Sequence, residues 1–365
     1  MTPDPISQPP CVAPRSSPRQ ETRGRVPAPD VSVLAAPAMS ADGRGLLTVP
    51  DSPCPASRLP PIGPSAAAAV SRTGATWRAY LELCKPRVVS LVVFTAVVSM
   101  CLAIPDGHLP WGTLLAGTLG IALGAASAAV LNQVADRDID AVMRRTHRRP
   151  LPTRTLGLSQ ALPFAAVLGG AAVALLWLLV NPLTAVLSLV SLIGYSVVYT
   201  RWLKWSTPQN IVLGGASGAA PAILGWTAAT GEVQTQALAL FLIVFVWTPP
   251  HFWPLAIARR DDYAAAGVPM LPVTHGIEFT RGRILAYTLA LVPVSLTPCI
   301  AGLSGPLYAA GALGLGALFV RRAWIFRQGG GAVAAMGLFR WSITYLSALF
   351  ALMLADRWLG VLLGF

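Results

Sequence analysis

Long apolar stretches alternate with short polar stretches along the chain from Val88 to the C-terminal end. Each apolar stretch is about 17 to 23 residues long, which is the length that a helix needs to cross the hydrocarbon core of a bilayer. The sixth stretch contains Pro249 and Pro250, where we expect the helix to break and restart. The pattern predicts an all-α, polytopic membrane protein with nine spanning helices, at residues 88–105, 111–132, 158–180, 183–200, 208–229, 236–257, 284–303, 305–324 and 341–363.

The first 76 residues have a different pattern. Fifteen prolines lie among the first 64 residues, together with serine, glycine and charges of both signs, and no apolar periodicity persists. Such a segment cannot bury enough apolar surface to offset its chain entropy, so residues 1–76 are predicted to be a disordered cytoplasmic tail and residues 77–365 a single transmembrane domain. No apolar core follows the start, which disfavours a signal peptide, and five acidic residues with so much proline disfavour a transit peptide.

Composition supports a membrane protein. Hydrophobic residues make up 54% of the 365 residues and charged residues only 12%, about half the charged fraction of a typical soluble domain. The formal net charge of +12 could indicate a nucleic-acid partner. The arginines lie between the apolar stretches rather than in a basic domain, however, so we expect no nucleic-acid partner. The five cysteines have no CxxC pair and indicate neither a disulfide framework nor a zinc site.

The positions of lysine and arginine predict the topology. The segment Arg72–Arg87 before the first span holds four of them, and the segments after spans two, four and six carry six, two and four. Four more lie at the end of span eight and in the segment after it, from Arg321 to Arg340. The segments after spans one, three, five and seven carry none. The positive-inside rule then predicts a cytoplasmic N-terminus and charged cytoplasmic loops, with Arg357 near the other end of the last span as the exception. We expect a bacterial inner membrane in preference to the mitochondrial inner membrane.

A first acidic motif follows the second span. Asn132, Asp136 and Asp140 are spaced by four residues, and three such positions on a helix drift by only about 80° and share one face. Asp138 lies off that face. An amide oxygen and two carboxylates are hard ligands that suit Mg²⁺, which is usually shared with phosphate oxygens of a substrate. The alternative is a solvated helix whose acids neutralise the arginines that follow, but such a helix has no need of the four-residue spacing.

Five arginines follow this motif and can serve two purposes. They fix the topology, and as a group beside the carboxylates they can bind an anion such as a diphosphate. For any one of them taken alone, topology is the simpler explanation. The five are Arg144, Arg145, Arg148, Arg149 and Arg154.

A second acidic motif follows the sixth span. If a helix restarts after Pro250, then His251, Ala258 and Asp262 fall on one face, with Asp261 to the side. The two acidic loops end in similar phrases, PLPT and MLPVT, so spans two and three are predicted to be related to spans six and seven as an internal repeat. An interfacial packing role and a functional role for His251 are both open.

The segment between the two motifs adds cations and small residues. Arg201 and Lys204 are predicted at the same membrane face as the acids. Gly214, Gly215 and Gly218 are small enough to admit a close helix neighbour or a flat ligand. Helix packing explains such residues in most membrane proteins and is the preferred interpretation.

Three phrases of the sequence resemble the heme O synthase (protoheme IX farnesyltransferase) branch of the UbiA-type membrane prenyltransferases. The phrases are NQVADRDIDAVMRRTHRRPLP, YTRWLKWSTPQNIVLGGASGAAPAILGW and WTPPHFWPLAIARRDDYAAAGVPMLP. The resemblance covers about Tyr80 to the C-terminal end and leaves the proline-rich tail unmatched. Three long phrases in the right order are far more specific than one N-x-x-x-D-x-x-x-D match.

The resemblance implies nine transmembrane helices around a central cavity, so that residues 77–365 form a prenyltransferase domain. It implies Mg²⁺-dependent transfer of the farnesyl group of farnesyl diphosphate to a vinyl group of heme b, with addition of water, giving heme O. The implied partners are these two substrates, the lipid bilayer and a downstream heme A synthase.

Matching of the motifs implies roles for individual residues. Asn132, Asp136, Asp140 and Asp262 are the predicted metal ligands. Together with His251 and Lys204, they are also the candidate catalytic residues. The same loops supply six candidate substrate-binding residues, which are Arg144, Arg148, Arg149, Arg201, Asp261 and Tyr199.

Two positions depart from the relatives. Many of them carry an acid four residues before the last aspartate of the second motif, where this chain has Ala258. The branch more often has a second basic residue where this chain has Trp205, which leaves Lys204 as the cation. Ala258 and the PHFW phrase disfavour one alternative, a prenyltransferase with an aromatic quinone-precursor acceptor. A secondary transporter is a further alternative, but it would carry its ionisable residues near mid-span rather than at one membrane face.

Overall fold

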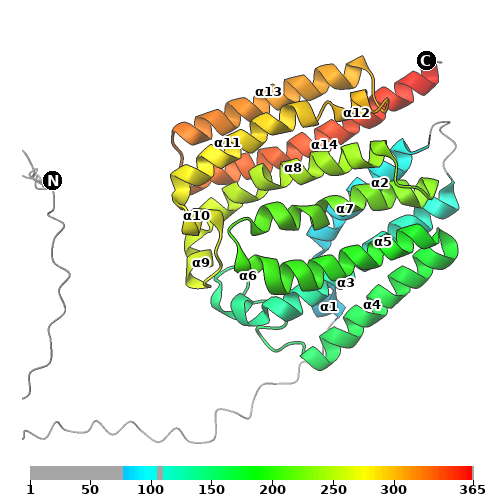
Figure 1. Ribbon diagram of the computed structural model, residues 1–365. Helices are drawn as coiled ribbons and strands as arrows, with labels where there is room; N and C mark the ends of the chain where they lie inside the picture. The colour runs from blue at the N-terminus through cyan, green and yellow to red at the C-terminus, as the bar shows by residue number, and fades with distance from the viewer. Residues whose placement is uncertain (1–76, 105–109, 364–365) are drawn as a thin grey trace, which may run out of the picture. The chain divides into compact units, whose positions relative to one another are not determined.

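The computed structural model describes residues 77–104 and 110–363, and the regular elements in this part of the chain are all helical (Figure 1). The predicted disordered tail, residues 1–76, lies outside the described residues. The elements in chain order are α1 (Trp77–Leu83), α2 (Pro86–Leu102), α3 (Trp111–Val142), α4 (Leu158–Leu179), α5 (Pro182–Ile193), the π-helix η1 (Gly194–Leu203), α6 (Lys204–Ser206), α7 (Asn210–Thr230), α8 (Thr235–Ala258), α9 (Arg260–Ala265), α10 (Leu271–Thr274), α11 (Gly276–Val294), α12 (Thr297–Ile300), α13 (Pro306–Gln328) and α14 (Ala332–Leu363).

The helices match the predicted spans. In the described ranges, eight helical segments are long and apolar enough to cross a membrane, or nine if α1 and α2 are counted as one span bent by 55°. The nine correspond in order to the nine predicted stretches, so the prediction of an all-α, multi-pass membrane protein is confirmed.

Several helices extend beyond their apolar stretches. α3 has 32 residues, and at about 1.5 Å per residue it is about 48 Å long, whereas the hydrocarbon core of a bilayer is about 30 Å thick. The first acidic motif therefore continues the same helix past the apolar stretch instead of lying in a loop. α11 and α14 likewise begin before their apolar stretches, at Gly276 and Ala332.

The expected break at Pro249 and Pro250 was wrong. α8 continues through both prolines and through Pro254 to Ala258. A proline removes one backbone hydrogen bond, but neighbouring helices can hold a membrane helix together despite that loss. Here all three prolines are buried where α8 packs against α7, α11 and α14. The helix ends at Ala258 and Arg259 caps it, so Asp262 lies on a separate short helix, α9, and not on one face with His251.

α2 and α7 approach each other closely at a glycine. A Cβ atom on Gly225 would overlap the backbone carbonyl of Ala96, so only glycine fits at this crossing. One turn away, the Ser99 hydroxyl donates to the backbone carbonyl of Ala222 over 2.5 Å. Small residues that let backbones touch are typical of helix contacts in membranes. Gly214 and Gly215 also pack closely, against Tyr199 and Thr248, whereas Gly218 faces open space.

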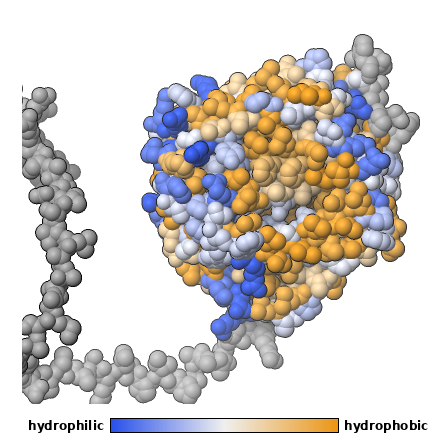
Figure 2. All heavy atoms as spheres, in the orientation of Figure 1, coloured by the Kyte–Doolittle hydropathy of each residue, from blue (hydrophilic) through white to orange (hydrophobic). Residues whose placement is uncertain are grey.

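The polar segments gather at the ends of the helices. Hydrophobic residues cover much of the middle of the visible face in Figure 2, and hydrophilic residues lie mainly towards its two ends. At one end, on the left of Figure 1, lie α6, α9 and α10. We call this end the charged end and define it by residues 143–157, 201–209, 259–275 and 329–331.

Candidate active site

The first acidic motif forms a buried polar cluster at the charged end. Asn132, Asp136 and Asp140 are only 4–6% exposed, and they lie on the same side of α3. The Asn132 amide donates to Asp136 Oδ2 over 3.1 Å. Asp138 points away into solvent and pairs with its neighbour Arg137. The predicted common face, with Asp138 off it, is confirmed.

Each carboxylate of the cluster is paired with a cation from a different segment. Lys204, at the start of α6, places its Nζ 2.7 Å from Asp136 Oδ1. Arg149, in the loop after α3, places a guanidinium nitrogen 2.7 Å from Asp140 Oδ2. Both acids and both cations are largely buried, so these are interior ion pairs. The structure thus brings together two cations that the sequence analysis singled out.

Lys85 joins the cluster, although the sequence analysis used it only as one of the topological charges. It lies in the bend between α1 and α2, and its Nζ donates to Asn132 Oδ1 over 2.6 Å. Its backbone is left-handed, with φ of 50°, a conformation that costs a non-glycine residue of order 1–3 kcal/mol and often marks a functional site. Gln133 holds the bend in place, because its side chain donates to the backbone carbonyl of Leu83 over 2.8 Å.

The π-helix η1 supplies the wall of the cluster. The Thr200 hydroxyl accepts from the Asn132 amide over 3.2 Å and donates to the backbone carbonyl of Tyr195 over 2.8 Å. The rings of Tyr195 and Tyr199 stack with centroids 5.5 Å apart, and Tyr199 packs on the bare backbone of Gly214. Single π-helical turns are often found at functional sites.

The second acidic motif lies in the neighbouring loop. The Asp262 side chain is 13% exposed and is 4.0 Å from the guanidinium of Arg259. Burial raises the pKa of the Tyr263 phenol, and the positive charges of Arg145, Arg259 and Arg149 act in the opposite direction. Because Arg145 and Arg149 follow the first motif, their effect at Tyr263 indicates that the two acidic loops are neighbours.

His251 lies at the interface between α8 and α14. Its ring stacks between Trp247 and Phe339, with centroids 4.1 and 4.6 Å away. Its Nδ1 is 2.7 Å from the Ser342 hydroxyl, which itself donates to the carbonyl of Phe339. The hydroxyl has one proton to donate, so Nδ1 carries the proton in this pair. No hydrogen bond links His251 to Asp262 in the described residues, and its role stays a prediction.

The other candidates lie on the surface of the charged end. Six of them are exposed, and these are Arg144, Arg145, Arg148, Arg154, Arg201 and Asp261. Trp205, which replaces the second basic residue that is more common in the branch, contacts the remaining cation. The centroid of its ring lies 5.8 Å from the Lys204 ammonium. A cation over an aromatic ring is stabilised by the ring quadrupole, so Trp205 helps to hold Lys204.

The charges of the cluster show what it can bind. Lys85, Lys204 and Arg149 carry three positive charges, and Asp136 and Asp140 carry two negative ones, which leaves an excess of one positive charge. In the described residues, no three acidic, histidine or cysteine side chains are close enough to enclose a metal ion by themselves. The cluster therefore offers a partial set of oxygen ligands surrounded by cations, which suits a metal ion shared with a phosphorylated substrate.

The chain is similar to known proteins over most of its length. The model of the UbiA prenyltransferase family matches residues 92–344. A protoheme IX farnesyltransferase of Nitrosococcus oceani is 56% identical over 283 residues, which cover 78% of this chain and 94% of the relative. Those of Alkalilimnicola ehrlichii and Hahella chejuensis are 57% and 54% identical, and they cover 79% and 81% of this chain and 95% and 99% of their own lengths.

Solved structures share the fold. A structure described for digeranylgeranylglyceryl phosphate synthase superposes with a TM-score of 0.65 at 16% identity, over 77% of this chain and 98% of that one. A UbiA homologue of Aeropyrum pernix gives 0.58 at 19% identity, over 73% and 97%. A homologue of Archaeoglobus fulgidus bound to GPP and Mg²⁺ gives 0.51 at 16% identity, over 75% and 99%.

Proposed function

The chain belongs to the UbiA prenyltransferase family, and we propose that it transfers the farnesyl group of farnesyl diphosphate to a vinyl group of heme b, with addition of water, to give heme O. It is a prenyltransferase, and relatives that are more than half identical to it carry the name protoheme IX farnesyltransferase. The observation that carries the proposal is the buried face of Asn132, Asp136 and Asp140, with Lys204 and Arg149 paired to it.

The residues of this face fit a magnesium ion. Asp136 and Asp140 would hold it from α3, with Asn132 beside them, and phosphate oxygens of the substrate would complete the ligand set. Asp262 on α9 is proposed as a further ligand from the second motif, although the described acids do not group around one ion in this structure. When bound, Mg²⁺ neutralises charge on the diphosphate as it leaves. Asn132 orients Asp136, because its amide donates to Oδ2 of that carboxylate.

The cations of the cluster favour the same step. Breaking the bond between farnesyl C1 and the diphosphate oxygen leaves the electron pair on the departing diphosphate. Lys204, Arg149 and Lys85 are already held in place around the acids, so they can stabilise that charge without rearranging. Arg144, Arg148 and Arg201 are exposed at the charged end, where they can attract anionic substrates, with Tyr199 and Asp261 as further substrate contacts.

The acceptor step needs no nucleophile from the chain. The electron-rich vinyl group of heme b forms a bond to farnesyl C1, and the resulting cation next to the porphyrin is captured by water, which loses one proton. Apolar spanning helices suit the farnesyl chain and the porphyrin, since both are hydrophobic. His251, whose ring is buried between Trp247 and Phe339, is part of the proposal as a candidate catalytic residue.

The proposed location is the bacterial inner membrane, with the charged end in the cytoplasm. The lysine and arginine residues of the interhelical segments are concentrated at that end, as the positive-inside rule requires for a cytoplasmic face. Both substrates would then enter from the inner leaflet. The product would pass to a downstream heme A synthase, which is the proposed partner.

The test compares acceptors directly. Membranes that contain the chain are incubated with farnesyl diphosphate, Mg²⁺ and either heme b or 4-hydroxybenzoate, and the products are identified by mass. The proposal predicts hydroxyethylfarnesyl heme in the first reaction and no prenylated aromatic acid in the second. The opposite outcome would assign the chain to the alternative aromatic-acceptor class, which Ala258 disfavours.

A further inference from the structure

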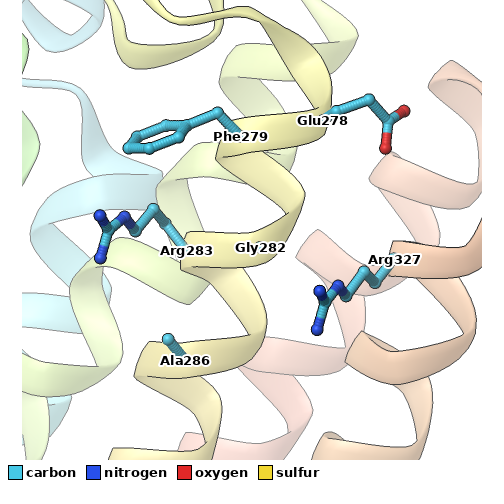
Figure 3. Close-up of a pocket in the computed structure, with 6 residues that line it drawn as sticks. All are labelled: Glu278, Phe279, Gly282, Arg283, Ala286 and Arg327. Carbon is cyan, nitrogen blue, oxygen red and sulfur yellow. The ribbon is translucent and has the colours of Figure 1, made fainter.

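A hollow lies between α11 and α13 near the charged end (Figure 3). Its volume is about 460 Å³, within the range of about 300–1,000 Å³ that small-molecule sites occupy. Neither α11 nor α13 contributes a residue to the acidic cluster described above. The hollow is lined by Glu278, Phe279, Gly282, Arg283, Ala286 and Arg327.

Two arginines of the hollow lack an acidic partner. Arg283 lies over the Phe279 ring at 4.7 Å from its centroid, and Arg327 lies 5.9 Å from the centroid of the Trp324 ring. In the described part of the chain no carboxylate lies within 4.0 Å of either guanidinium. Each guanidinium lies near an aromatic ring and has no carboxylate partner among the described residues, so its N–H groups are available and the hollow has the chemistry of an anion site.

The acid on the rim is already occupied. Glu278 pairs with Arg281 over 2.5 Å, and Arg281 also donates to the backbone carbonyl of Gly330. This bridge ties α11 to the turn between α13 and α14. Glu278 forms no ion pair with Arg283 or Arg327. Figure 3 shows Arg283 on the opposite side of α11 from Glu278 and Arg327.

The hollow lies at the ends of two candidate spanning helices, where lipid headgroups are expected. It is formed by the first three turns of α11, which begins at Gly276, and by the last turn of α13, which ends at Gln328. Phe279 and Trp324 are 40% and 51% exposed. Exposed aromatic residues beside arginines at the end of a span are typical of the membrane–water interface.

An apolar track continues from the hollow along α11. Arg283, Ala286 and Ala290 follow each other at spacings of three and four residues, so they share one face of the helix. Ala286 and Ala290 are exposed, and Leu289 beside them is 51% exposed. A ligand with a phosphate in the hollow and acyl chains beneath it would cover this track, whereas a free phosphate would not.

We propose that the α11–α13 hollow binds the headgroup of an anionic phospholipid, with Arg283 and Arg327 as its cationic contacts from the two sides of the hollow and its acyl chains along α11. Basic pockets between membrane helices bind anionic headgroups in this way. The site is separate from the proposed prenyl transfer, and it needs no residue of the acidic cluster.

Gly282 allows the hollow to be filled without disturbing the fold. A Cβ atom at Gly282 would meet no atom within 4 Å. Gly282→Trp should therefore fill the hollow, and Gly282→Ala is the matched control that leaves it open. Arg283→Gln with Arg327→Gln removes both proposed contacts. Its charge-matched control replaces Arg321 and Arg340, which are exposed and do not line the hollow.

The measurement is lipid retention by the purified full chain in micelles that contain equal amounts of phosphatidylglycerol and phosphatidylcholine, followed by native mass spectrometry. The proposal predicts retention of phosphatidylglycerol that weakens about 30-fold in the Arg283/Arg327 variant, since each arginine near a membrane surface contributes about fivefold. Gly282→Trp should lose retention, and both controls should keep it. Equal loss of phosphatidylglycerol retention in the Arg321/Arg340 variant would mean that the effect comes from general surface charge and not from the hollow. Displacement by inorganic phosphate or farnesyl diphosphate would assign the site to a soluble phosphate. Either result would overturn the proposal.

Discussion

The Lys204 ammonium lies 2.7 Å from an oxygen of the Asp136 carboxylate, although the two residues are 68 positions apart in the chain. Their side chains are only 12% and 9% exposed. The ion pair connects the start of α6 to the C-terminal part of α3. It therefore holds the Lys204 ammonium beside the first acidic motif.

Lys204→Met should destabilise the protein, because it leaves the Asp136 carboxylate buried without its cation. Breaking one side of a buried pair typically costs about 3–5 kcal/mol. Asp136→Asn in the same chain removes the unpaired charge and should recover much of the loss, without recovering activity. Arg137→Met is the control, since its pair with Asp138 is exposed and contributes little. Thermal unfolding in detergent checks this, and an equal effect of the two single methionine variants would contradict it.

Gly225→Ala should weaken the contact between α2 and α7. The new methyl group would overlap the backbone of Ala96, and overpacking of this kind typically costs about 1–3 kcal/mol. Gly218→Ala on the same helix meets open space and should be neutral or slightly stabilising, because alanine favours helix over glycine. Equal unfolding temperatures for the two variants would contradict the claim that the contact between α2 and α7 requires glycine at position 225.

Much of this arrangement was predictable from periodicity. The four-residue spacing of Asn132, Asp136 and Asp140 was enough to predict one helical face, because local spacing determines which side chains share a side of a helix. The spans were predictable for a similar reason, since each apolar stretch has the length of a bilayer crossing.

Contacts between distant segments were not predictable in the same way. Lys85 reaches Asn132 only because α1 and α2 bend at Cys84–Lys85 and Gln133 anchors that bend. The position of Lys85 before Pro86 was the available signal, because a residue that precedes proline is disfavoured in the α-helical conformation and often marks a helix boundary. His251 was placed wrongly relative to Asp262, because α8 ends at Ala258 and Asp262 lies on the separate helix α9. The expected break at Pro249 and Pro250 failed for a different reason, since both prolines are buried against neighbouring helices that hold α8 together.

Cysteine accessibility should place the charged end on one side of the membrane. In a background without the five native cysteines, single cysteines at Arg144, Asp261 and Gln328 should react with a membrane-impermeant reagent only from the cytoplasmic side. A cysteine at Glu232, which lies in the turn between α7 and α8, should react from the opposite side. Labelling of Arg144 and Asp261 from different sides would separate the two acidic loops and remove the shared site.

Deletion of residues 1–70 should leave heme farnesylation unchanged per inserted molecule. The relatives are matched over 94–99% of their own lengths by 77–83% of this chain, and the tail carries no motif. The lysine and arginine residues from Arg72 to Arg87 should suffice to hold the orientation. A large loss of activity at equal insertion would mean that the proline-rich segment contacts the active site or a partner.

The most direct test of the proposed chemistry compares Asp136→Asn with Asp138→Asn, two isosteric changes on the same helix that each remove one carboxylate. Asp136 is buried in the cluster beside Lys204, whereas Asp138 is exposed and off the face. With heme b, farnesyl diphosphate and Mg²⁺, Asp136→Asn should lower the rate of formation of farnesylated heme by at least about 100-fold, the scale expected when a group that stabilises transition-state charge is removed. Asp138→Asn should keep most of the rate at equal insertion. Equal activity of the Asp136→Asn variant and the parent would contradict the account.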